Sequence, residues 1–257
     1  MRYGGPSAAT VLGRADHRPW PLPESRWVMA MRWERLAFLH WRFPRDEIQR
    51  RLPDGLRVDL RDGDAWIGIV PFLMSNVRLR GLFPVPGTTR FAELNVRTYV
   101  TDGTRPGVWF FSLDAASRLA VRGARTLFHL PYFDARMCLS DDDPIDYESE
   151  RTHRGSAPAR FRATYRAAGD ARTFGPGSVE RWLTERYCLY AADRRGRIFR
   201  GDVHHAPWAL APGEVDIVSN GLLEGVGLPP AEGPPLVHVA RPLDVLAWPL
   251  RRVHPRR

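Results

Sequence analysis

One short segment, residues 91–100 (FAELNVRTYV), carries an acid, an amide and a guanidinium at alternate positions. Successive side chains of a β-strand point to opposite faces, so Glu93, Asn95 and Arg97 would share one face at roughly 6.6 Å intervals. If that face lines an interior, the arginine can bind a carboxylate and the glutamate can transfer a proton, which suits a small polar or anionic ligand. The alternative is a solvated outer face with an ordinary salt bridge. Tyr99 falls on the same face as Glu93 and favours burial.

Histidine and tyrosine side chains at the ends of predicted elements are further candidates for proton transfer or ligand binding. His40 lies near the end of the strand-like run 32–43, whereas His129 and Tyr132 follow a predicted helix over 114–128. Histidines at such positions also serve as packed or capping residues, and the pattern leaves both roles open.

The pair His204-His205 resembles a metal site only at first sight. Adjacent strand residues point to opposite faces, and Asp202 with His204 supplies two ligands where a site needs three or four. We therefore predict no metal site, and no motif indicates another cofactor.

All 38 basic residues are arginine, and the formal net charge is +9. Without lysine, the chain has no side-chain amine that could form a Schiff base, and arginine cannot replace it. The charge is dispersed, and no recognition helix or aromatic RNA-binding motif accompanies it. Nucleic-acid binding therefore ranks last among the functions considered.

The chain reads as mostly β. Residues 64–73 and 107–113 are almost continuously apolar, as expected for strands covered on both faces. Residues 160–166 alternate between apolar and polar side chains and are expected to pair with 145–152. Pro71 predicts a strand end or a bulge.

Three helices are predicted, over 45–51, 114–128 and 178–189. Asp114 and Ser178 stand at the starts of the last two as N-caps. With no regular alternation of strands and helices, we expect an α+β fold that is mostly β. Its centre is an antiparallel sheet or barrel with a few outer helices.

Residues 1–27 are expected to form a loosely ordered N-terminal arm before a single domain over 28–257. The arm lacks the apolar core of a signal peptide, and no apolar run approaches the roughly 20 residues of a membrane-spanning helix. Cys138 and Cys188 carry no redox or metal spacing. A cytoplasmic protein without membrane association is the expectation.

Several long motifs resemble the YqjF-like family of uncharacterised bacterial proteins, over roughly residues 30–210. They are RWERLAFLHWRF, LPDGLRVD, GDAWIGIVPFLM, FAELNVRTYV, RPGVWFFSLDAASRLAVRGAR, LPYFDARM, LTERYCLY and HHAPW. That family is placed in the acetoacetate decarboxylase-like superfamily. The resemblance implies a strongly bent antiparallel sheet that closes into a cone or barrel around a small cavity, with a few helices outside.

The resemblance also implies positions for the site. The decarboxylase has a Schiff-base lysine after a proline, and here the proline matches Pro131 and the lysine position falls on Tyr132. The decarboxylase's active-site glutamate matches Glu93. Its active-site arginine falls near Glu34 and Arg35. Because the chain has no lysine, decarboxylation through an iminium intermediate is excluded for this chain alone.

The leading hypothesis is a cavity protein for a small carboxylate or an enolisable carbonyl compound. It would act by amine-independent lyase, hydratase or tautomerase chemistry. Glu93 would be the acid or base and Arg97 the anion clamp, with Asn95, His129 and Tyr132 as orienting groups. The remaining predicted ligand-binding residues are Arg35, His40 and Tyr99.

A second hypothesis uses the same cavity without catalysis, as a sensor or sequestering protein. The third is an arginine-rich nucleic-acid binder. The sequence does not decide between enzyme and binder, and homo-oligomer formation stays open.

Overall fold

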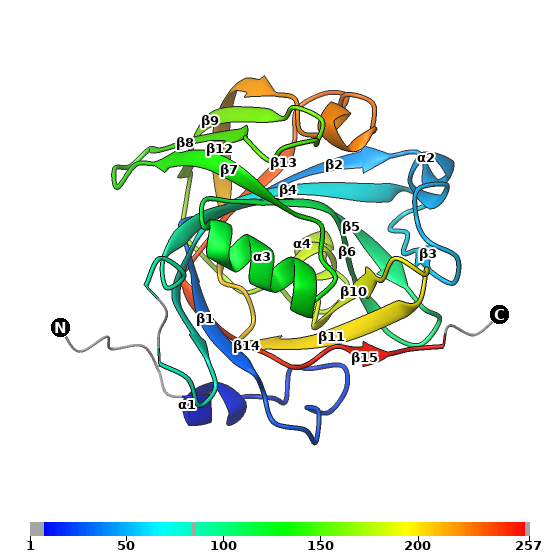
Figure 1. Cartoon of the computed structure of the whole chain (residues 1–257). Coiled ribbons are helices and arrows are strands. Elements are labelled where there is room, and N and C mark those ends of the chain that lie inside the picture. The colour runs from blue at the N-terminus through cyan, green and yellow to red at the C-terminus, as the bar shows by residue number, and fades with distance from the viewer. Residues whose placement is uncertain (1–7, 84–85, 255–257) are drawn as a thin grey trace.

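A computed structural model of the chain describes residues 8–83 and 86–254 (Figure 1). The α-helices are α1 (Ala8–Leu12), α2 (Arg45–Gln49), α3 (Arg118–Leu127) and α4 (Val179–Thr184), and one 3-10 turn is η1 (Glu224–Val226). The first strands are β1 (Met29–Glu34), β2 (Leu36–Phe43), β3 (Arg57–Val58), β4 (Ala65–Leu79), β5 (Phe91–Thr101), β6 (Pro106–Ala115), β7 (Tyr132–Leu139) and β8 (Ile145–Arg151). The others are β9 (Arg160–Ala167), β10 (Cys188–Ala192), β11 (Ile198–His205), β12 (Leu210–Asn220), β13 (Leu236–Ala240), β14 (Leu243–Ala247) and β15 (Arg251–Arg252).

The strands form one continuous sheet that closes on itself twice. The hydrogen-bonded order is β1-β14-β11-β10-β6-β7-β8-β9-β12-β13-β2-β4-β5-β3, and β1 also pairs with β4 while β5 also pairs with β6. Two rings of strands therefore share the wall β4-β5-β6. Most pairs are antiparallel, and β6 runs parallel to both β7 and β10. In Figure 1, β7, β8 and β9 lie at one side of α3 and β1, β14 and β11 at the other.

The shared wall is buried on both faces because each ring packs a separate core against it. Ile67 and Ile69 of β4 belong to the core under β8 and β9, whereas Val70 and Phe72 belong to the core inside the other ring. This arrangement confirms the prediction that 64–73 is a strand covered on both sides. The mostly β fold is also confirmed, as is the pairing of β8 with β9.

The predicted run 32–43 is broken in two at Arg35, which has a positive φ of 51°. The break lets β4 change partner, because β4 pairs with β2 as far as Ile69 and with β1 from Leu73 onward. Pro71, which lacks an N–H, lies inside β4 at this change of partner. The expected strand end is therefore absent, and the irregularity lies in the neighbouring strands.

Two predicted helices are shorter than expected. Asp114 is not an N-cap but a buried residue of β6, where its carboxylate pairs with Arg151 at 2.8 Å. The helix begins later, and its cap is Ser117, whose Oγ accepts a hydrogen bond from the amide of Ala120. Ser178 caps α4 as predicted, but the helix ends at Thr184 because the chain then turns into β10.

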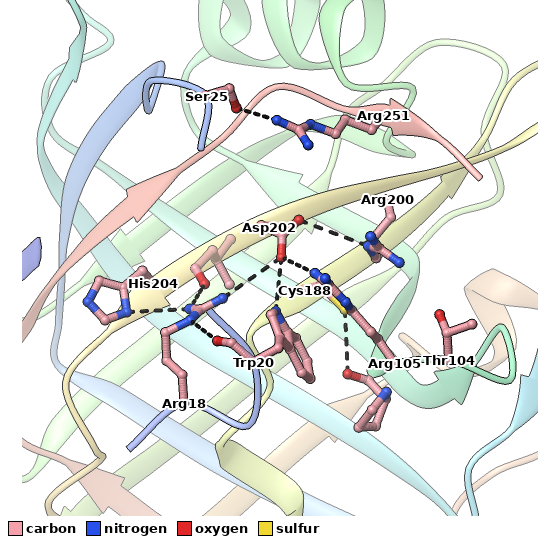
Figure 2. A network of polar contacts seen from close by, with 12 residues as sticks. Arg18, Trp20, Ser25, Thr104, Arg105, Cys188, Arg200, Asp202, His204 and Arg251 are labelled. Atoms are coloured by element: carbon pink, nitrogen blue, oxygen red, sulfur yellow. Dashed lines mark hydrogen bonds and ion pairs between the residues drawn. The ribbon is translucent and has the colours of Figure 1, made fainter. Parts of the chain in front are cut away.

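The N-terminal arm differs from the expected loose segment over its described part, residues 8–27 (Figure 2). The Arg18 side chain is fully buried, and its guanidinium lies 3.8 Å from the Asp202 carboxylate on β11. Trp20 and Arg105 each donate to the same carboxylate at 3.1 Å. The arm is thus anchored by a buried polar network that residue composition does not reveal. Residues 1–7 of the predicted arm lie outside the described residues.

In the described part of the chain, no helix is long and apolar enough to cross a membrane.

Substitution Arg151→Leu should destabilise the fold by about 3–5 kcal/mol, because it leaves the carboxylate of Asp114 buried without a cation. The free energy of unfolding in urea measures this. The control is Arg160→Leu, since Arg160 pairs with Glu150 at the surface and its side chain is 74% exposed. That variant should unfold almost as the wild type does. If Arg151→Leu lowers the free energy of unfolding no more than Arg160→Leu does, the assignment of a buried, stabilising ion pair to Asp114 and Arg151 is contradicted.

Candidate functional site

The polar face of β5 points into the protein. Glu93 is 2% exposed, Asn95 7% and Tyr99 0%, and Arg97 is partly buried. Phe72 of β4 and Ala115 of β6 flank Glu93 in the sheet. The solvated alternative for this face is therefore excluded, and the four polar side chains lie along one interior wall.

Glu93 is buried without a cationic partner. The Tyr132 hydroxyl donates to both of its carboxyl oxygens, at 3.1 and 3.2 Å. No arginine or histidine in the described part of the chain forms an ion pair with it. Loss of hydration raises the pKa of Glu93 from 4.5 to about 8, although hydrogen bonds from Tyr132 and Asn95 oppose the shift. The carboxyl group is therefore mostly protonated at neutral pH.

Tyr132 reaches Glu93 because β7 starts beside the end of β6. Leu113 pairs with Tyr132 in the parallel register, and the amide of Leu113 donates to the carbonyl of Pro131 at 3.0 Å. The Arg125 guanidinium on α3 donates to the carbonyl of Tyr132 at 2.6 Å and fixes the start of the strand. Tyr132 and Glu93, the two residues that the resemblance is expected to align with the decarboxylase's lysine and glutamate, thus contact each other.

Arg97 lies further along the same wall, and no acidic side chain among the described residues forms an ion pair with it. Its Nη2 donates to the carbonyl of Leu183 at 3.2 Å and lies 3.4 Å from the Tyr99 hydroxyl. The guanidinium carbon lies 5.1 Å from the centre of the Phe38 ring. Its Nε is buried without a hydrogen-bond partner. Unsatisfied cationic donors of this kind favour an anionic ligand.

His40 adds a neutral imidazole to this end of the wall. Its Nε2 lies 2.6 Å from the Tyr99 hydroxyl, whereas its Nδ1 is buried without a partner. A side chain at Gly68 would bring a Cβ within 3.1 Å of the His40 ring, so glycine leaves the space that the ring occupies. Burial, followed by the charge of Arg97, holds the pKa of His40 well below its usual range.

Two predicted site residues lie elsewhere. His129 is exposed at the end of α3, and its ring lies 5.2 Å from the Phe199 ring. Its positive φ of 50° turns the chain toward β7 and leaves the imidazole outside the wall. Arg35 sits at the break between β1 and β2 and pairs with the exposed Asp141 at 2.9 Å. Neither residue joins Glu93.

Sequence analysis missed a group of aromatic side chains that lies inside the same ring of strands as Glu93. Trp33 stacks on Trp208 with ring centres 5.8 Å apart and meets Phe72, the sheet neighbour of Glu93, at 6.0 Å. Its indole Nε1 is buried without a partner, as is Oδ1 of Asn95. The alternation of side chains along 29–34 is the signal that would have placed Trp33 inside. These orphaned polar atoms leave a donor and an acceptor for a ligand.

In the described part of the chain, no three His, Cys, Asp or Glu side chains are grouped as metal ligands. His204 and His205 instead bond to the carbonyls of Val11 and Ala206, at 2.9 and 2.8 Å.

The fold is shared with solved structures of low sequence identity. The enduracididine biosynthesis enzyme MppR complexed with pyruvate superposes with a TM-score of 0.62 at 12% identity, covering 93% of this chain and 94% of that chain. Acetoacetate decarboxylase from Legionella pneumophila superposes with a TM-score of 0.57 at 13% identity, covering 93% of each chain. The chain therefore has the acetoacetate decarboxylase-like fold.

Sequence comparison adds the family. The DUF2071 family, described as an uncharacterized conserved protein, matches residues 30–244. The uncharacterized protein YqjF from Bacillus subtilis (strain 168) is 43% identical over 232 residues, covering 90% of this chain and 95% of that protein. The chain belongs to the DUF2071 family, and the resemblance to YqjF-like proteins is confirmed.

The stability of the protein should depend on pH through Glu93. Because its pKa rises from 4.5 to about 8 on folding, the folded protein keeps a proton that the unfolded chain releases. This stabilisation is complete below pH 4.5 and is lost as the pH rises through about 8. Between these limits the wild type should lose up to about 1.4 kcal/mol per pH unit relative to Glu93→Gln.

Urea unfolding of both proteins at several pH values between 5 and 8 measures this difference. The exposed Glu148 offers a matched control, because Glu148→Gln should keep the pH slope of the wild type. If the difference in free energy of unfolding between wild type and Glu93→Gln does not change with pH, Glu93 has the same pKa in the folded and unfolded chains, and the prediction is wrong.

Proposed function

We propose that the interior wall of β5 binds a small organic acid with an enolisable carbonyl group and catalyses proton transfer at the carbon beside that carbonyl. The observation that carries the proposal is the buried Glu93, which has no cationic partner in the part of the chain that the structure describes and a pKa of about 8. A group with this pKa holds and releases a proton near neutral pH, as general acid–base catalysis requires.

Each polar residue has a role in this step. The fraction of Glu93 that is ionised takes the α-proton, the C–H electron pair forms the C=C bond, and the carbonyl π electrons move to oxygen. Tyr132 donates a hydrogen bond to the developing enolate oxygen, and the amide of Asn95 orients the same group. If the proton on Glu93 exchanges with solvent before Glu93 reprotonates the carbon, the cycle is a proton exchange. If Glu93 delivers its proton to the enolate oxygen instead, the product is the enol and the step is a tautomerisation.

Arg97 is proposed as the clamp for the ligand's carboxylate. Its guanidinium lacks an acidic partner among the described residues, and its Nε is unsatisfied. His40 and Tyr99 position the Arg97 side chain, because the Tyr99 hydroxyl contacts both the His40 imidazole and the Arg97 guanidinium. Without a lysine the ligand carbonyl is activated by hydrogen bonds alone, which separates this chemistry from iminium catalysis.

The fold comparison supports the ligand class. One solved structure with this fold, MppR, is complexed with pyruvate, an organic acid with an enolisable carbonyl. At 12% identity this likeness concerns the fold, so the residues of this chain carry the argument for its site.

Exchange of the pyruvate methyl protons in D₂O, followed by proton NMR, tests the proposal. The wild type should accelerate exchange, and Glu93→Gln should lower the rate by about 10²–10⁴-fold because it removes the proton acceptor. Tyr132→Phe should lower the rate by a smaller factor and retain binding. The control Glu148→Gln should match the wild type.

Thermal shift with pyruvate and 2-oxobutanoate separates binding from turnover. Arg97→Gln should abolish the shift, whereas Glu93→Gln should keep it. A shift without exchange in the wild type would contradict catalysis and favour a sensor or sequestering protein. No shift with either acid, or exchange that persists in Glu93→Gln, would contradict the proposed site.

A further inference from the structure

A cavity lies beside α4, and we call it the outer pocket. Its volume is about 400 Å³, within the range of roughly 300–1,000 Å³ that small-molecule pockets occupy. The residues that matter for its chemistry are His17, Arg61, Arg181, Trp182, Arg186 and Tyr187. Glu93 is not among its lining residues.

The carboxylates that line the outer pocket are already engaged. Asp59 pairs with Arg186 at 2.5 Å. Glu185 accepts hydrogen bonds from the Tyr187 hydroxyl and from the backbone amide of Trp208, the latter at 2.8 Å. The charge of Asp59 is thus balanced by Arg186, whereas Glu185 accepts only from neutral donors and keeps its negative charge.

One guanidinium in the outer pocket is free. Arg181 is partly buried, and its guanidinium forms no hydrogen bond or ion pair with any described residue. Nη2 of the neighbouring Arg61 donates to the carbonyl of Gly177 at 2.6 Å. Arg186, 6% exposed, also keeps one buried Nη2 without a partner. Arg61 also pairs with Asp62 at 3.3 Å, so what the pocket offers an anion is guanidinium donors without a partner among the described residues, on Arg181 and Arg186.

Proline and tryptophan side chains supply apolar parts of the lining. Pro19, Pro106 and Pro176 contribute rings that lose little conformational entropy when a ligand binds. Trp182 is held in place between two groups, with the Arg186 guanidinium carbon 4.3 Å from its ring centre and the Tyr99 ring at 4.9 Å. Such walls suit a flat apolar body attached to the anionic group.

We propose that the outer pocket is a second binding site, which takes an organic carboxylate with a flat apolar body, its carboxylate on Arg181 and its body against Trp182. The site is distinct from the wall of β5, because Trp182 and Leu183 of α4 stand between the pocket and the Tyr99–Arg97 pair. It does not depend on the proposed proton transfer.

Isothermal titration with benzoate tests this proposal, and benzamide is the uncharged counterpart. The wild type should bind benzoate, and both Arg181→Gln and the change to benzamide should raise Kd at least tenfold. The charge control is Arg162→Gln, an exposed arginine on β9 outside the pocket, which should keep Kd within twofold of the wild type.

Variants of the inner wall separate the two sites. Glu93→Gln and Arg97→Gln should leave benzoate binding unchanged, so failure of the proposed catalysis would not affect this result. Loss of binding in Arg97→Gln with retention in Arg181→Gln would place benzoate in the inner site and overturn the proposal. The absence of binding heat at millimolar benzoate, or equal Kd for wild type and Arg181→Gln, would overturn it as well.

Discussion

The wall formed by β4, β5 and β6 is covered on both faces, and this double burial is the constraint on which the site depends. Ala92, Leu94 and Val96 pack into one core, so the side chains between them must face the other core. Those side chains include Glu93 and Asn95, which are thereby removed from water. Polar groups at such positions cost free energy unless they are hydrogen-bonded, which explains the Tyr132 and Asn95 contacts.

The interior charges do not neutralise each other. Glu93 accepts a hydrogen bond from a tyrosine hydroxyl. Arg97, four residues further along β5, donates to a backbone carbonyl. A buried ion pair would satisfy both groups, and their separation leaves one proton-holding acid and one cation facing the interior. This division suits a ligand with two functional groups, a carboxylate for the arginine and a reacting carbonyl for the acid.

Strand alternation predicted the face shared by Glu93, Asn95 and Arg97, because side chains alternate between the two faces in every β-strand. The family resemblance pointed separately to Glu93 and Tyr132 as site residues. They lie 39 positions apart and meet through the parallel register of β6 and β7, which the sequence does not reveal. His129 and Arg35 were wrongly placed, because each has a positive φ that redirects the chain and no local pattern reveals it. Asp114 appeared to be a cap, since its partner Arg151 is distant in sequence.

The proposed chemistry requires that Glu93 keeps its proton at neutral pH in most of the folded molecules. Carbon-13 NMR of the protein labelled at glutamate Cδ, with Glu93→Gln to assign the resonance, measures this directly. The Glu93 signal should titrate near pH 8, because burial raises the pKa of this carboxyl group to about that value. A Glu93 signal that titrates at about 4.3, the ordinary value for an exposed glutamate, would contradict it.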